Sequence, residues 1–148
     1  MLRKLFVIFG ILIIGVTAAA AQSCEKPIAD RQALMKKSGS MAKIGSAMIK
    51  GTTPFDLAKV KEIFAAFAND AGQMSNLFPE CSKTGHKTTA SPAIWEKPDD
   101  FKAAITKFIA DIKAAQESTK DLDGLKASFQ TIGKDCNNCH QTFRVRRS

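Results

Sequence analysis

The stretch "DLDGLKASFQTIGKDCNNCHQTF", residues 121–143, decides how this chain is expected to fold. Its apolar residues recur at spacings of three and four, which is the period of an amphipathic helix. The helix is expected to start near Asp121. The predicted core-facing stripe ends in two cysteines and a histidine, and it consists of Leu122, Leu125, Phe129, Ile132, Cys136, Cys139, His140 and Phe143.

Three further helices are expected before this one. The first covers about residues 25–50 and ends at Gly51. The second opens with Thr53 as N-cap and Pro54 at the first helical position, and the third starts near Pro98. No strand pattern competes with these helices. The sequence therefore predicts an all-α fold, an antiparallel up-down-up-down four-helix bundle.

The second and third helices also carry apolar stripes at helical spacing, whereas residues 80–97 show no clean period and predict a long loop. These two stripes are simply expected to form core. They consist of Val60, Ile63, Phe64, Phe67, Ala71, Met74 and Leu77 in the second helix, and of Phe101, Ile105, Phe108, Ile109 and Ile112 in the third.

The C-x-x-C-H pattern near the end of the chain predicts a covalent cofactor. Residues i, i+3 and i+4 share a helix face, so Cys136, Cys139 and His140 are expected to point together into the bundle. Two thiols at this spacing can form thioether bonds to the two vinyl groups of a haem, and the adjacent imidazole can bind its iron. The sequence thus predicts one covalent haem c.

Two other uses of the cysteine pair remain as alternatives. A redox-active C-x-x-C is expected at the start of a helix in a βαβ setting, and this pair lies deep in the last helix. A zinc site would need further ligands, and the remaining cysteines and histidine are Cys24, Cys81 and His86.

The N-terminus predicts export. Arg3 and Lys4 precede an apolar run at residues 5–16, and small residues follow at 19–21. This is the layout of a secretory signal peptide, here residues 1–21, with a cytochrome domain at 22–148. The run is shorter than the roughly 20 residues of a membrane span, so we expect a periplasmic protein that is not integral to the membrane after cleavage. An uncleaved anchor, or lipid attachment at Cys24, is the alternative.

The chain is basic, with 22 Lys and Arg against 14 Asp and Glu and a formal net charge of +8. Export argues against nucleic acid as a partner, and so does a positive charge that is spread along the chain apart from "RVRR" at 144–147. An acidic redox partner fits the charge better. No acid–base pair or nucleophile stands out, so an enzyme is not expected.

Several stretches together with the position of C-x-x-C-H resemble the class II cytochromes c, the group that contains cytochrome c′. They are "RQALM" at 31–35, "KGTTPFD" at 50–56, "LFP" at 77–79, "SPAIW" at 91–95 and "IGKDCNNCHQTFR" at 132–144. The resemblance spans essentially the whole chain after the signal peptide. It implies a four-helix bundle that holds one covalent haem.

The resemblance also directs attention to the sixth iron site. In cytochrome c′ a non-ligating side chain, four residues after an arginine of the first helix, covers an open site; in the low-spin branch a methionine binds there. Here Arg31 is followed by Met35. At about 1.5 Å per residue, His140 and Met35 lie roughly 9 and 15 Å from the shared end of the bundle, with Met41 about 9 Å and Met48 about 20 Å beyond Met35. We therefore expect His140 and Met35 as axial ligands.

Other outcomes for this site stay open. Met35 can instead be an apolar filler over an open site, and His86 can be the ligand if its loop folds over the distal face. With Met35 bound, the protein is expected to be a one-electron carrier. With an open site it would be a high-spin, five-coordinate cytochrome c′ that binds nitric oxide or other small gases.

The resemblance implies roles for further residues. Arg31 and Gln32 would lie by the haem propionates, Arg144 near the proximal side, and Trp95 near the haem edge. An ordinary exposed arginine is the alternative for Arg31. Family members often dimerise through the first two helices, so a homodimer is possible.

Two cysteines, Cys24 and Cys81, fall outside the family pattern, yet both are expected at the haem end of the bundle. Because the periplasm is oxidising, we predict a disulfide between them.

Overall fold

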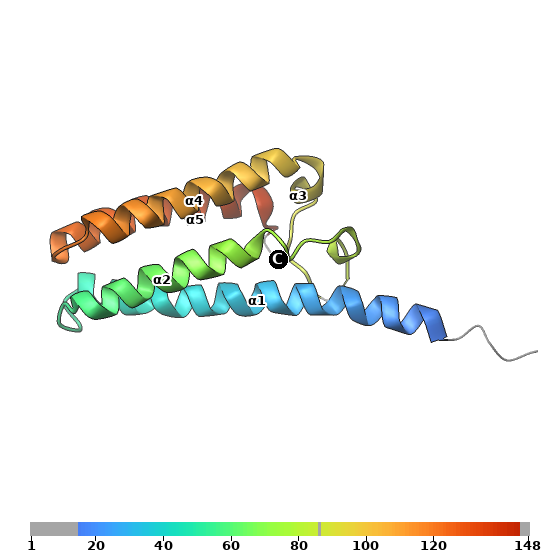
Figure 1. The fold of residues 1–148 in the computed structure, drawn as a ribbon, viewed down its shortest axis with the longest axis horizontal. Coiled ribbons are helices and arrows are strands. Elements are labelled where there is room, and N and C mark those ends of the chain that lie inside the picture. The colour runs from blue at the N-terminus through green and yellow to red at the C-terminus, as the bar shows by residue number, and fades with distance from the viewer. Residues whose placement is uncertain (1–14, 86, 146–148) are drawn as a thin grey trace, which may run out of the picture.

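Four long antiparallel helices make up the computed structural model, which describes residues 15–85 and 87–145 (Figure 1). Helices α1 and α2 form one layer, and α4 and α5 form the other. The described part is all helix and turn apart from one isolated backbone bridge, so the predicted all-α bundle is confirmed. The elements are α1 Gly15–Ile49, α2 Leu57–Met74, η1 Glu80–Ser82, α3 Ala93–Glu96, α4 Pro98–Ser118 and α5 Leu122–Phe143.

Three helix ends lie where the sequence predicts them, whereas α2 ends at Met74, before the expected stop at Pro79. Gly51 stops α1 in a left-handed conformation, with φ of 72°, which a residue with a side chain adopts only at a cost. Pro98 occupies the first turn of α4. The Asp121 carboxylate caps α5 by accepting a hydrogen bond of 2.8 Å from the backbone N–H of Gly124. These three ends are confirmed.

The predicted start of α2 is wrong. The N-cap is Asp56, whose carboxylate accepts from the N–H of Lys59 at 3.1 Å, and not Thr53. The N–H groups of Thr52 and Thr53 bond instead to the carbonyl of Ala47, so this segment is still completing the turn that ends α1. Proline at position 54 therefore lies in the turn, ahead of the helix.

Helix α1 is longer than expected at its N-terminal end. It begins at Gly15, inside the predicted signal peptide, and its first part extends past the other helices (Figure 1). Residues 1–14 lie outside the described part, so the predicted signal peptide stays a prediction. No helix of the described part is long and apolar enough to cross a membrane.

The buried apolar side chains form two clusters at opposite ends of the bundle. One lies toward the α1–α2 and α4–α5 turns and consists of Met48, Val60, Ile63, Phe64, Phe67, Ile112, Ala115, Leu125 and Ile132. The other lies toward α3 and consists of Met74, Ile94, Phe101, Ile105 and Phe143. The predicted stripes supply nearly all of both clusters. Ile109 is an error of that prediction, because it is 36% exposed on the outer side of α4.

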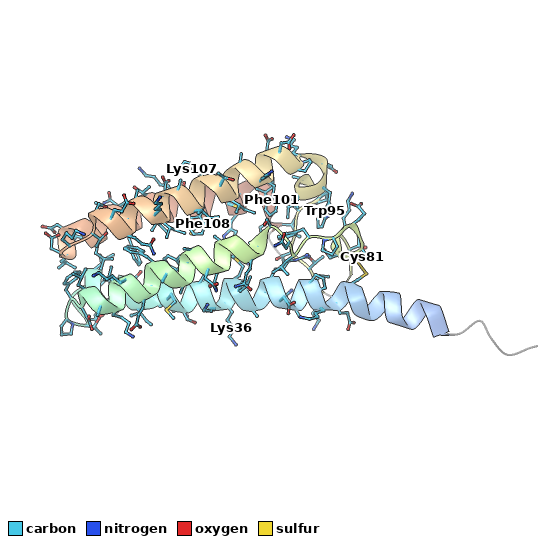
Figure 2. The ribbon with its side chains drawn as sticks, in the orientation of Figure 1. Lys36, Cys81, Trp95, Phe101, Lys107 and Phe108 are labelled. Atoms are coloured by element: carbon cyan, nitrogen blue, oxygen red, sulfur yellow. A yellow bond between two sulfur atoms is a disulfide. The ribbon has the colours of Figure 1, made fainter. Side chains whose placement is uncertain are left out.

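The long loop between α2 and α4 is partly structured. It holds the single turn η1 and the short helix α3, where a structureless loop was expected. Figure 2 shows Trp95 and Cys81 at this end of the molecule.

Candidate functional site

A cavity of about 820 Å³ lies between the two layers, in reach of both apolar clusters. A volume of this size is typical of sites for cofactors and other small molecules. Its walls are mainly apolar, and they include Phe67, Ala71, Met74, Phe78, Ile94, Phe101, Ala104, Ile105, Phe108, Phe129, Ile132 and Phe143.

The cavity opens between α1 and α5. The lining residues from α2 and α4 are buried or half-buried, whereas about half of those from α1 and α5 are exposed. We call this opening the mouth, and its exposed lining residues are Gln32, Met35, Lys36, Gly39, Lys87, Gly133, Cys136, His140 and Arg144.

The three residues of the C-x-x-C-H pattern all line this cavity from the last turns of α5. Cys136 and Cys139 are free thiols and are not joined to each other. Burial raises the pKa of both thiols, with Asp135 as a second cause at Cys136, so both are held in the neutral form. Two free thiols one helical turn apart fit the vinyl groups of a haem.

His140 faces the same cavity, and its imidazole makes no hydrogen bond within the part of the chain that the structure describes. Burial lowers its pKa, and the charge of Arg144 lowers it further. The neutral imidazole is the form that can bind a metal through a ring nitrogen. Among the described residues, no group of three or more His, Cys, Asp and Glu side chains could hold a metal ion by itself, which gives the zinc alternative no support.

Two methionines line the cavity, from different helices. Met35 on α1 is 41% exposed and belongs to neither apolar cluster. Met74 on α2 is 8% exposed and is part of the cluster near α3. The sequence analysis did not consider Met74 for the site, because its place in an apolar stripe is also what simple packing predicts.

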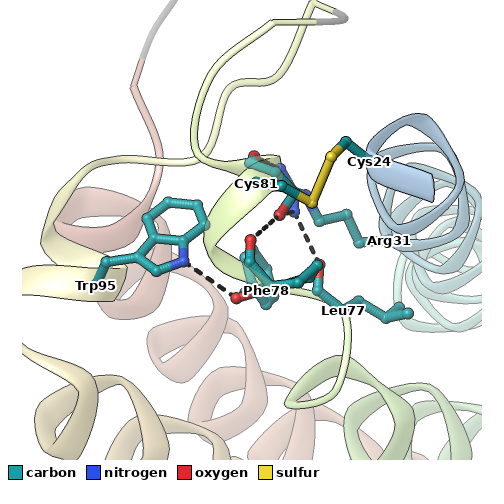
Figure 3. Close-up of a disulfide and its surroundings, with 8 residues drawn as sticks. Cys24, Arg31, Leu77, Phe78, Cys81 and Trp95 are labelled. Atoms are coloured by element: carbon teal, nitrogen blue, oxygen red, sulfur yellow. Dashed lines mark hydrogen bonds between the residues drawn. A yellow bond between two sulfur atoms is a disulfide. The ribbon is translucent and has the colours of Figure 1, made fainter. Parts of the chain in front are cut away.

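Arg31 is a buried anchor for the loop that forms one wall of the cavity (Figure 3). Its guanidinium donates to the carbonyl of Leu77 at 2.8 Å, to the hydroxyl and carbonyl of Ser82 at 2.8 and 2.9 Å, and to the hydroxyl of Thr88 at 2.7 Å. It also lies 4.6 Å from the ring centre of Phe78. The alternative of an ordinary exposed arginine is therefore wrong.

A propionate contact for Arg31 stays a prediction, since protein acceptors already engage both terminal nitrogens. Gln32 and Arg144 also line the cavity. The Gln32 amide comes within 3.5 Å of the carbonyl of Lys87, a long contact at best. His86 lies outside the described residues, so its proposed role as a ligand is untested.

The predicted disulfide between Cys24 and Cys81 is confirmed. It joins α1 to η1 with the two Cα atoms 5.6 Å apart, beside the Arg31 anchor (Figure 3). The two links hold the same loop against α1.

Phe78 holds Trp95 by ring packing and by a hydrogen bond. Trp95 is absent from the cavity wall and packs edge-on behind Phe78, with ring centres 6.0 Å apart. Its indole N–H donates to the carbonyl of Phe78 at 3.1 Å. The expected position near the haem edge stays a prediction.

Asp135 is a lining residue that the sequence analysis missed. It is 7% exposed, and one carboxylate oxygen accepts from the amine of Lys107 at 2.7 Å. The other oxygen has no hydrogen-bond partner in the described part, and burial raises the pKa of this carboxyl. An acid next to Cys136 gives no periodic signal of burial, so the pairing with Lys107 emerges only from the packing of α4 on α5.

The end of α5 is tied to the loop before α3. An antiparallel bridge links Ala90 to Arg144, and the N–H of Ser91 donates to the carbonyl of Phe143 at 3.0 Å. The N–H of Val145 donates to the carbonyl of Thr89 at 2.9 Å. These bonds close the end of the cavity just past His140.

Comparison with known proteins agrees with this geometry. The family described as cytochrome C′ matches residues 26–144. A cytochrome c′ of Rhodopseudomonas palustris is 38% identical over 98% of both chains, and a cytochrome c-556 of Agrobacterium fabrum is 34% identical over 99% of this chain and 100% of that one.

The solved structure of cytochrome c′ from Rhodopseudomonas palustris superposes with a TM-score of 0.79 at 40% identity. It covers 82% of this chain and 98% of that one. A four-helix bundle, a cofactor-sized cavity carrying C-x-x-C-H, and these similarities together show that the chain belongs to the cytochrome c′ family, the class II cytochromes c, which bind one covalent haem c.

Proposed function

We propose that this mono-haem c-type cytochrome is a periplasmic one-electron carrier and not an enzyme. The haem would be attached through Cys136 and Cys139, with His140 and Met35 as axial ligands. The observation that carries the proposal is that Met35 lines the cavity from α1, opposite the C-x-x-C-H face of α5, without taking part in either apolar cluster.

Met35 differs from the other described methionines in this respect. Met48 and Met74 are buried members of the clusters, and Met41 packs against one of them. A methionine that only fills space is expected to pack in this way, because its value as a filler lies in its contacts. A large apolar side chain that is 41% exposed at a cavity mouth is better explained by binding something in the cavity.

The haem iron, when bound, would supply the one-electron couple, and ligation by a thioether together with histidine favours a raised potential. The protein would hold the haem in place and shield it from water. Cys136 and Cys139 would attach the haem to α5, and the neutral imidazole of His140, on the same helix, would bind its iron. The aromatic walls, such as Phe67 and Phe101, would keep water away from it.

A gas-binding function is the second candidate, and the similarity to cytochrome c′ favours it. The relative with that name is slightly more similar, at 38% identity, than the cytochrome c-556 at 34%. In that case Met35 would cover the sixth site without binding iron. The cytochrome c-556 relative instead fits the low-spin branch with a bound methionine.

Optical spectra of the haem-loaded protein separate the two functions. We expect a low-spin spectrum with a sulfur-to-iron charge-transfer band, and little change when nitric oxide or carbon monoxide is added. Replacing Met35 with alanine should make the spectrum high-spin and allow gas to bind. The control is Met74→Leu, which changes the other methionine of the cavity wall and should leave the spectrum low-spin. A wild-type spectrum that is already high-spin would assign the gas-binding function instead.

A further inference from the structure

Positive charge is concentrated around the mouth of the cavity. Lys36, Lys87 and Arg144 line it and are exposed. Lys43 and Lys50 extend the same side of α1, since steps of seven residues return to nearly the same helix face. We call these five residues the basic rim. Figure 2 shows Lys36 pointing away from the bundle on the α1 side, with Lys107 on the opposite side of the molecule.

The sequence stretches that carry the rim hold no acidic residue. Residues 31–55, 81–95 and 136–148, which carry the rim, contain no Asp or Glu at all. One carboxylate lines the cavity, Asp135, and it is buried and paired with Lys107. The exposed acids lie outside these stretches, as with Glu25 on α1, Glu62 on α2 and Asp123 on α5.

Three of the rim lysines also lack an ion-pair partner among the described residues. Within the described part, Lys36, Lys43 and Lys50 make no ion pair or side-chain hydrogen bond, whereas Lys26, Lys37 and Lys59 each pair with a carboxylate. Exposed, unpaired charges of one sign attract a partner of the opposite sign and speed its approach. They give little stability to the fold itself.

We propose that the basic rim is the docking surface for a redox protein with an acidic face. The inference rests on the proposed electron-carrier function. If the cavity holds the redox cofactor, a partner that exchanges electrons with it should approach the side where the cavity reaches the surface. A second copy of this chain is disfavoured as the occupant, since a two-fold contact across the rim would place lysine against lysine.

The cofactor's own carboxylates are the main competitors for these charges, and Lys43 separates the two uses. Lys36 lines the cavity and could serve either purpose, but Lys43 lies along the rim and outside the cavity wall. A charge reversal at Lys43 should therefore affect docking and leave the cofactor undisturbed. Lys113 on α4 is the matched control, because it is also an exposed lysine without an ion pair in the described part.

The test measures stopped-flow reduction of the ferric protein by the hydroquinone of an acidic flavodoxin, which moves one electron from the flavin to the haem. At about 10 mM ionic strength we expect Lys36→Glu and Lys43→Glu each to slow the bimolecular rate about 5- to 10-fold, with Lys113→Glu within about twofold of wild type. The differences should vanish at about 0.5 M salt, where charges are screened within a few ångströms.

Voltammetry at an uncharged, hydroxyl-terminated electrode reports electron exchange without docking. Normal voltammetry with equal flavodoxin rates for Lys43→Glu and Lys113→Glu would overturn the docking surface and leave the electron carrier intact. A shifted potential in Lys43→Glu would also overturn it, since the charge would then act on the cofactor. Loss of voltammetric exchange in the wild type would count against the proposed function itself.

Discussion

Removal of the disulfide between Cys24 and Cys81 should cost much stability while leaving the site unchanged. The bridge spans a sequence separation of 57 residues. In the loop-entropy treatment, a loop of that size stabilises the folded state by about 4 kcal/mol at 25 °C. With a urea m value of about 1.5 kcal/mol/M, the unfolding midpoint of a Cys24→Ser/Cys81→Ser variant should fall by about 2 to 3 M.

The site should survive because Arg31 holds the same loop independently. Its four hydrogen bonds to Leu77, Ser82 and Thr88 keep that segment against α1 without the bridge. The assay is urea unfolding of the haem-loaded protein followed by circular dichroism, with the optical spectrum recorded in parallel. A loss below about 1 kcal/mol would refute the entropic argument, and an altered optical spectrum would refute the idea that Arg31 suffices.

Three further variants test the packing and the part that the haem plays in it. Gly45→Ala should destabilise the bundle by about 1 to 3 kcal/mol in the same urea assay, because the added Cβ would lie 2.1 Å from the ring of Phe129. Gly72→Ala is the contrasting variant, because nothing lies within 4 Å of its added Cβ. It should be neutral or stabilise the bundle by up to about 1 kcal/mol. A Cys136→Ser/Cys139→Ser chain isolated without haem should show much reduced helix content and no sharp unfolding transition by circular dichroism, and a native-like cooperative transition would contradict this expectation.

The bundle could be predicted from the sequence because its signals are local. Apolar spacing marks the helices, and Gly51, Pro98 and Asp121 mark three of their ends by properties of a single residue. The start of α2 was missed because two candidate caps three residues apart compete. Thr53 and Asp56 are both good caps, and the choice depends on backbone bonds to Ala47 that the sequence does not display.

The candidate site likewise has one part that the sequence predicts and another that it does not. The C-x-x-C-H pattern is local, and all of its residues line the cavity. Arg31 could be singled out, but not its partners, because two of its four acceptors are backbone carbonyls and the others are single hydroxyl groups of Ser82 and Thr88. Such contacts depend on how a loop folds over a helix, and they leave no repeated pattern in the residues.

The size of the cavity explains why the cofactor and the bundle must be one folding unit. A cavity costs about 24 cal/mol for each cubic ångström that side chains leave unfilled, so about 820 Å³ corresponds to an upper bound of roughly 20 kcal/mol. Water entering between α1 and α5 lowers this figure, but domains of this size are stable by only about 5 to 15 kcal/mol.

The two apolar clusters touch the cavity from opposite ends. A rigid apolar group held between the two clusters would therefore connect them into one continuous core. For the same reason, thioether bonds at Cys136 and Cys139 would do more than retain a redox centre, since they would keep the central part of the core from dissociating.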